Sequence, residues 1–196
     1  MLQELFSVSG GIQGIVDRFP KVFSRVGKLS GYQLKLHIDP EVRPVVQKPR
    51  RIPYPFKEKV QQRASAQLFV SVCVDMRCAS EAIQRKKIPI PTMDEVLQEL
   101  NEGTVFPKLD INMGFHQTEL EEGYLLFRYK RMSFGINNAP EQYQNILRQT
   151  TAGCPGATNI EDDIVVHGKT TEEHDRNVVA LLNRLQERNL TLNKDK

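Results

Sequence analysis

The chain has 196 residues, of which 39% are hydrophobic and 26% are charged, and its formal net charge at pH 7 is +3. This length suffices for one medium-sized domain or two small ones. We find no apolar run of about 18 residues and no basic, apolar leader, so we expect neither a membrane-spanning helix nor a secretory signal. The sequence therefore predicts an intracellular protein, cytoplasmic or nuclear, without a membrane partner.

The cysteines and histidines indicate neither a disulfide framework nor a zinc site. Cys73, Cys78 and Cys154 are odd in number and form no C-x-x-C pair, and the four histidines follow no zinc-ligand spacing. This usage is typical of a protein in a reducing compartment.

Positive charge is concentrated in a few stretches. Residues 43–59 carry six basic residues against one acidic residue, a local charge of +5. Residues 85–87 and 128–131 form two further basic clusters. Such clusters suit a phosphate backbone, and a solvated surface is the alternative interpretation. The candidate nucleic-acid contacts in these stretches are Arg50, Arg51, Arg128, Lys130 and Arg131.

The first sixty residues predict little regular structure apart from one strand. Glycines at positions 10, 11 and 14 argue against a helix within residues 1–31. Residues 32–38 alternate apolar and polar side chains, which predicts a half-buried strand. Five prolines between positions 40 and 55 favour an extended surface arm. We therefore divide the chain into a basic N-terminal arm, residues 1–60, and a folded domain, residues 61–196.

Strands and helices then alternate. We expect a short polar helix over residues 56–66, strands over 68–74 and 105–111, an apolar run at 125–127, and a last strand at 190–192. Pro107 should confine the second of these strands to a sheet edge or force a bulge. Thr92 and Thr170 begin T-x-x-E capping boxes, and Asn138 precedes a proline in the first turn of a helix. This order predicts an α+β fold with helices on one face of an antiparallel sheet.

The stretch Thr158–His167, T-N-I-E-D-D-I-V-V-H, has the pattern of a tight hairpin with carboxylates at its tip. Neighbouring carboxylates repel each other unless a metal ion, a basic partner or full solvation compensates. Asp110 ends another short apolar run far upstream. Together with Asp162 and Asp163 it supplies the oxygen ligands that a two-metal phosphoryl-transfer site requires. A solvated turn is the alternative interpretation of the D-D pair.

Five motifs follow one another along the chain: V-C-V-D-M-R (72–77), I-P-I-P-T-M-D-E-V-L (88–97), K-L-D-I-N-M-G-F-H-Q (108–117), S-F-G-I-N-N-A-P-E-Q-Y-Q (133–144) and N-I-E-D-D-I-V-V-H-G-K-T-T-E-E-H (159–174). In this order they resemble the reverse transcriptase of gypsy-type long-terminal-repeat retrotransposons. In addition, F-P-K-V-F-S and L-H-I-D-P resemble the segment joining protease to polymerase, and the closing L-T-L-N-K-D-K resembles the end of the palm.

This resemblance implies the palm of a right-hand polymerase that extends a primer on an RNA or DNA template with deoxynucleoside triphosphates. Asp110, Asp162 and Asp163 would be the catalytic residues and would hold two Mg²⁺ or Mn²⁺ ions. Phe115 would block a ribose 2′-hydroxyl, and plain core packing is its alternative role, as it is for Phe134. The nucleotide-binding set is completed by Phe134, Gly135 and Arg77.

Several positions depart from the family pattern. Residues 61–71 replace the longer, lysine-rich fingers, with Ser71 where an arginine is expected, and Gly123 joins two segments that a strand normally separates. Ile160 and Glu161 are unusual in the Y-x-D-D form, and the thumb and RNase H lie outside these residues. We therefore expect fingers that are largely missing and polymerase activity that is weak or lost. The alternatives are a non-catalytic nucleic-acid-binding remnant and a poorly folded product of a decaying element.

Overall fold

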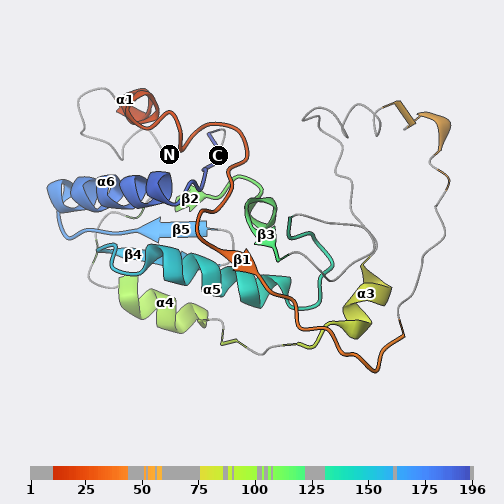
Figure 1. Ribbon diagram of the computed structural model, residues 1–196. Coiled ribbons are helices and arrows are strands. Elements are labelled where there is room, and N and C mark those ends of the chain that lie inside the picture. The colour runs from red at the N-terminus through yellow and green to blue at the C-terminus, as the bar shows by residue number, and fades with distance from the viewer. Residues whose placement is uncertain are drawn as a thin grey trace.

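Figure 1 shows the computed structural model of the chain. The structure describes residues 11–43, 51, 53–55, 57–58, 76–85, 88–89, 91–100, 103, 106, 108–121, 131–160 and 163–194. The expected strand 68–74, most of the helix 56–66, the apolar run 125–127, and the sites of Ser71, Gly123 and Glu161 lie outside these residues.

The main sheet has three antiparallel strands in the order β2 (Lys108–Asp110), β5 (Asp163–Val166) and β4 (Ala157–Ile160). Strands β4 and β5 form the predicted hairpin, in which Ile160 lies opposite Asp163. Strand β2 confirms part of the expected strand 105–111 and stands at the end of the three-strand order, while Pro107 lies outside the described residues. The expected strand at 190–192 is reduced to one bridge between Leu192 and Ile111.

The two faces of this sheet have different environments. Residues directly opposite each other in an antiparallel pair point to the same side. Leu109 pairs with Ile164, and Ile164 is fully buried. Asp110 pairs with Asp163 on the other face, where both residues are only partly buried. The apolar face is therefore turned toward the core and the acidic face toward solvent.

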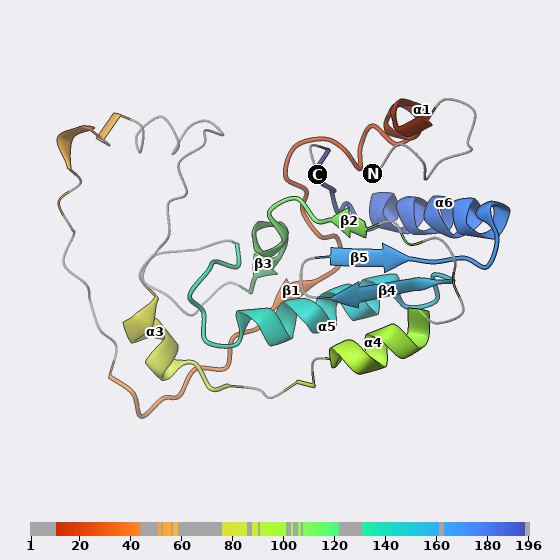
Figure 2. The same ribbon diagram turned by 180° about the vertical axis from the view of Figure 1, so that it is seen from behind.

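Helices α5 (Ala139–Thr151) and α6 (Thr171–Glu187) cover the apolar face. The Gln144 side chain donates to the Asn159 carbonyl of β4 (3.0 Å), and α5 and α6 also contact each other. Seen from behind, β4 and β5 lie in front of α5 (Figure 2). This arrangement confirms the predicted α+β plan. The buried apolar residues of the two helices are Ala139, Tyr143, Ile146, Leu147, Val178, Leu181, Leu182 and Leu185.

The predicted capping box at Thr92 is complete, whereas the one at Thr170 is formed in part, because Glu173 Oε2 accepts from the Lys169 amide (3.0 Å). At the start of α4 (Met93–Leu100), the Thr92 amide donates to Glu95 Oε2 (2.7 Å) and the Glu95 amide donates to Thr92 Oγ1 (3.3 Å). At the start of α6, the Glu173 amide donates to Thr170 Oγ1 (3.2 Å). Asn138 occupies the N-cap position of α5, but its side chain makes no capping hydrogen bond.

The N-terminal residues correct two expectations. Residues Gly11–Arg18 form helix α1, because burial of Ile15 and Phe19 outweighs the modest helix cost of glycine. Residues 54 and 55, expected in the extended arm, have helical backbone, whereas residues 57 and 58 are helical as expected for the helix over 56–66. The proposed division at residue 60 stays a prediction, although six buried residues before it share the core of α5 and α6. These are Ile15, Phe19, Val22, Leu29, Leu34 and Leu36.

Three short elements complete the fold. Strand β1 (Gln33–Leu34) pairs in parallel with β3 (Glu119–Leu120), and the 3-10 helix η1 (Gly114–Gln117) lies between β2 and β3 in the chain. Helix α3 (Arg77–Ala82) stands away from the main sheet (Figure 1). Among the described helices, none combines the length and apolarity needed to cross a membrane.

Candidate active site

The acidic face of the main sheet brings together two of the three predicted catalytic carboxylates. Asp110 ends β2 and Asp163 begins β5, and the two residues are direct partners in the strand register. Directly opposite residues on neighbouring antiparallel strands have Cβ atoms roughly 4.5–5.5 Å apart, so their carboxylates can approach a common ligand. The hairpin register leaves only residues 161–162 between β4 and β5. Asp162 itself lies outside the described residues.

Lys108 compensates part of the negative charge at this face. Its ammonium forms an ion pair with Asp163 Oδ2 (2.8 Å). The hydrogen bond to Asp163, with the negative charges of Asp163 and Asp110, holds the pKa of Lys108 above its usual value. The other oxygen, Asp163 Oδ1, is buried and has no hydrogen-bond partner among the described residues. An oxygen in this state is a suitable ligand for a cation.

Asp110 is fixed from its other side by the segment that follows α6. The Asn193 amide donates to the Asp110 carbonyl (2.9 Å), and Asn193 Nδ2 donates to Asp110 Oδ2 (3.3 Å). Our sequence interpretation did not single out Asn193 as a site residue. Asn193 lies in the closing L-T-L-N-K-D-K, which resembles the end of the palm, but neither this likeness nor the L-T-L pattern indicates which strand the segment joins.

The donor set fits a divalent metal in chemistry but is incomplete within the described residues. Asp110 and Asp163 offer carboxylate oxygens, the ligands that Mg²⁺ and Mn²⁺ prefer. No group of three or more histidine, cysteine or acidic side chains converges among the residues that the structure describes. Asp162, the third predicted ligand, falls in the two-residue connection outside that part of the chain.

Phe115 and Phe134, the two predicted nucleotide contacts, lie together beside the sheet. Their ring centroids are 5.0 Å apart, and the rings of Phe115 and Tyr143 are perpendicular, with centroids 5.1 Å apart. Phe115 is half-buried, whereas Phe134 is 46% exposed. Phe115 therefore packs between the buried Tyr143 and the more exposed Phe134. Tyr143, which the sequence analysis did not single out, is the residue that supports it.

Gly135 and Arg77 are linked through helix α3. Gly135 has a φ of +88°, which a residue with a side chain rarely adopts, and its carbonyl accepts a hydrogen bond from Ser80 Oγ (2.7 Å). Arg77 is exposed at the first position of the same helix. The structure thus places Arg77 on an element that holds the Phe134–Gly135 turn.

An ion pair attaches the segment after α3 to the first turn of α5. Arg85 Nε donates to Glu141 Oε1 (3.0 Å), and the Glu141 side chain is only 10% exposed. Burial raises the pKa of the Glu141 carboxyl, but hydrogen bonds, above all the one from Arg85, bring this pKa below its ordinary value of 4.5. The pair therefore stabilises the fold above the unfolded-state pKa, and this contribution is lost as the pH falls through the folded-state pKa.

We expect Arg85→Met to lower the free energy of unfolding by about 1 kcal/mol at neutral pH, because Glu141 keeps its charge without its partner. The difference from wild type should shrink as the pH falls through the folded-state pKa of Glu141 and the carboxyl becomes protonated. Urea unfolding followed by circular dichroism at neutral pH and over a series of lower pH values checks this, with the exposed Arg148→Met on the same helix as a control. A difference that persists unchanged at low pH would contradict the assignment.

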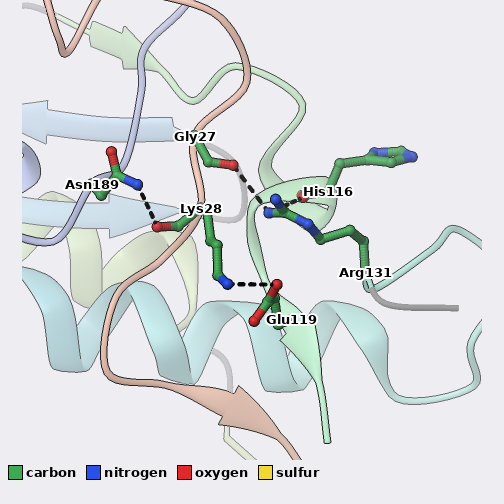
Figure 3. Close-up of polar contacts among 6 residues, drawn as sticks. All are labelled: Gly27, Lys28, His116, Glu119, Arg131 and Asn189. Atoms are coloured by element: carbon green, nitrogen blue, oxygen red, sulfur yellow. Dashed lines mark hydrogen bonds and ion pairs between the residues drawn. The ribbon is translucent and has the colours of Figure 1, made fainter. Parts of the chain in front are cut away.

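Arg131 was predicted to contact nucleic acid, but its side chain forms hydrogen bonds within the fold. Its Nη1 donates to the carbonyls of Gly27 (3.1 Å) and His116 (3.0 Å), as Figure 3 shows. The neighbouring Lys28 pairs with Glu119 (2.9 Å), and the hydrogen bond from Lys28 lowers the pKa of Glu119. These contacts favour a role for Arg131 in anchoring the N-terminal segment against η1.

The structure describes only one of the other predicted nucleic-acid contacts. Arg51 is exposed. Arg50, Arg128 and Lys130 lie outside the described residues. Nucleic-acid contact by these residues therefore stays a prediction, and of the five candidate contacts Arg51 is the one that the structure describes as exposed.

Sequence comparison relates the chain to retroelement polyproteins. It is 32% identical over 140 residues to a retrovirus-related Pol polyprotein from transposon 297 of Drosophila melanogaster, covering 64% of the chain and 13% of that protein. It is 29% identical over 130 residues to the uncharacterized protein K02A2.6 of Caenorhabditis elegans, covering 60% and 10%, respectively. The Tf2-3 transposon polyprotein of Schizosaccharomyces pombe is 28% identical over 136 residues, covering 63% and 10%.

The chain spans only about a tenth of the length of these relatives. No protein-family model matches it.

Structural comparison identifies the fold. A foamy viral protease-reverse transcriptase in complex with an RNA/DNA hybrid superposes with a TM-score of 0.73 at 15% identity, covering all of this chain and 32% of that one. A selenomethionine-labelled mutant of the prototype foamy virus enzyme gives 0.75 at 13% identity, covering 94% and 30%. The chain therefore has the polymerase fold of reverse transcriptases and is related in sequence to the Pol polyproteins of retroelements.

Proposed function

We propose that this chain is an RNA-directed DNA polymerase domain derived from a gypsy-type retroelement, with catalysis weakened by its shortened fingers. The observation that carries the proposal is the direct pairing of Asp110 with Asp163 on the solvent-facing side of the palm sheet. Paired carboxylates on adjacent strands, one of them with a buried oxygen that lacks a hydrogen-bond partner among the described residues, are a costly arrangement for a purely structural sheet.

Asp110, Asp162 and Asp163 would hold two divalent ions. When bound, such ions lower the pKa of a primer 3′-hydroxyl and neutralise charge on the incoming triphosphate. The chain's own contribution is positional. The strand register sets the spacing of Asp110 and Asp163, and Asn193 orients the Asp110 carboxylate. Phe115, supported by Tyr143, would limit the space beside the sugar of the incoming nucleotide.

The proposed partners are a template-primer duplex and deoxynucleoside triphosphates. One foamy viral structure with this fold holds an RNA/DNA hybrid and another holds double-stranded DNA, which supports a duplex as the partner here. Arg77, Phe134 and Gly135 would meet the nucleotide, and Arg51 would contribute salt-sensitive affinity for the phosphate backbone.

Primer extension with labelled deoxynucleotides and Mn²⁺ tests the proposal. We expect slow extension by the wild type and a loss of at least about a hundredfold in Asp110→Asn and in the Asp162→Asn/Asp163→Asn double variant, because metal ligands are removed. Duplex binding should be retained in these variants. No extension by a folded wild type that still binds duplex would overturn the polymerase proposal and leave the non-catalytic binding remnant.

A further inference from the structure

Lys108 occupies an unusual position relative to the two paired carboxylates. It lies two residues before Asp110 on β2, so its side chain leaves the strand on the same acidic face. In the register it is opposite Val165, and it reaches diagonally to Asp163. Diagonal neighbours across strands are roughly 7–8 Å apart, a distance that a lysine side chain can span.

The ammonium group contacts the same carboxylate that a divalent ion would use. Its contact is to Asp163 Oδ2 at 2.8 Å, and the second oxygen of that carboxylate is the buried Oδ1. An ammonium and a divalent ion on the same carboxylate repel each other, so binding of the ion disfavours the lysine contact. The two cations therefore compete for Asp163.

The Lys108 side chain can also leave this position at low cost. It is 64% exposed, against 29% for Asp163, and a lysine ammonium rehydrates readily on its flexible stem. Arg131, in contrast, is held by two backbone carbonyls. Displacing Lys108 would cost one solvent-exposed ion pair.

We propose that Lys108 is a displaceable counter-ion of the candidate metal site: it neutralises Asp163 while no divalent ion is bound, swings into solvent when one binds, and thereby weakens the affinity for the ion. The proposal rests on the proposed function only in taking Asp163 as a metal ligand. It adds a determinant of metal affinity that belongs to this chain's own β2 strand and does not depend on nucleotide or duplex.

The test is Mn²⁺ binding by the full chain, without nucleotide, followed by the electron paramagnetic resonance signal of free Mn²⁺ at low ionic strength. We expect Lys108→Met to bind Mn²⁺ roughly threefold to tenfold more tightly than wild type, since one exposed ion pair no longer competes. Lys35→Met is the matched control, because Lys35 is 55% exposed and pairs with Glu121 (3.7 Å) next to the separate β1–β3 sheet. It removes the same charge and should leave the affinity unchanged.

Asp163→Asn in the same titration identifies the site. We expect its affinity for Mn²⁺ to fall well below that of wild type. Equal or weaker binding by Lys108→Met, with Asp163→Asn still impaired, would overturn the counter-ion role and leave the metal site standing. If Asp163→Asn binds Mn²⁺ as wild type does, or if no form binds Mn²⁺, then Asp163 is not a metal ligand. That result would overturn the counter-ion role of Lys108 and remove Asp163 from the proposed polymerase site. Circular dichroism establishes that each variant is folded.

Discussion

Replacing Gln117 by leucine is expected to lower the free energy of unfolding by about 3–5 kcal/mol, although the two side chains are similar in size. Gln117 is fully buried. Its Nε2 donates to the carbonyls of Asn112 (2.6 Å) and Thr191 (2.8 Å), and its Oε1 accepts from the Thr191 amide (2.8 Å). Leucine would leave the buried Thr191 amide and Asn112 carbonyl without these partners, and each such loss costs roughly 1–3 kcal/mol.

The large expected effect follows from what Gln117 connects. Its backbone carbonyl accepts from the Leu29 amide (2.8 Å), so one residue joins the N-terminal segment, η1 and the segment after α6. Thr191 also accepts from the Gly27 amide through Oγ1 (3.0 Å). The same C-terminal segment carries Asn193, which holds Asp110. We therefore expect the Gln117 network to stabilise the candidate active site as well as the fold.

Urea unfolding followed by far-ultraviolet circular dichroism measures this effect, since the chain contains no tryptophan. At this chain length, a loss of this size should lower the melting temperature by roughly 10 °C. The control is Gln149→Leu, at an exposed position of α5, which should change stability by less than about 0.5 kcal/mol. Similar stabilities for the two variants would show that the buried hydrogen bonds of Gln117 contribute little.

Local sequence signals predicted the parts of the fold that depend on local chemistry. The capping boxes at Thr92 and Thr170 and the hairpin around Ile160 and Asp163 are found where short-range patterns placed them. The pairing of Asp110 with Asp163 joins residues far apart in the chain. No periodicity specifies that register, and only the resemblance to a polymerase family placed the two carboxylates in one site.

Tertiary packing decided what local signals could not. Three nearby glycines argued against a helix at residues 11–18, yet α1 forms because its apolar side chains enter a core built largely from residues beyond 110. Arg131 belongs to a basic cluster in sequence, but its guanidinium meets backbone carbonyls from two distant segments. The type of a residue gives its charge, but it does not indicate which hydrogen-bond acceptors surround it in the fold.

Gly114→Ala is expected to be the most damaging conservative change near the candidate nucleotide contacts, at about 3 kcal/mol. Gly114 is buried at the start of η1, and a methyl group there would collide with the ring and hydroxyl of Tyr143. Tyr143 is itself 1% exposed and packs edge-on against Phe115, so it has no free space into which to move. The collision should therefore also displace Phe115.

Two comparisons separate this steric effect from the general cost of adding a side chain to glycine. Gly153 has a φ of +79° and nothing within 4 Å of an added Cβ, so Gly153→Ala should cost only about 1 kcal/mol of backbone strain.

Tyr143→Leu removes the atoms that the added methyl group at position 114 would strike, because leucine lacks the far side of the ring. In a double-mutant cycle, Gly114→Ala and Tyr143→Leu should therefore be less destabilising together than the sum of the single changes, by about 1 kcal/mol or more. Strict additivity would mean that Gly114 is required for its backbone alone, and that the close approach of η1 to Tyr143 does not position Phe115.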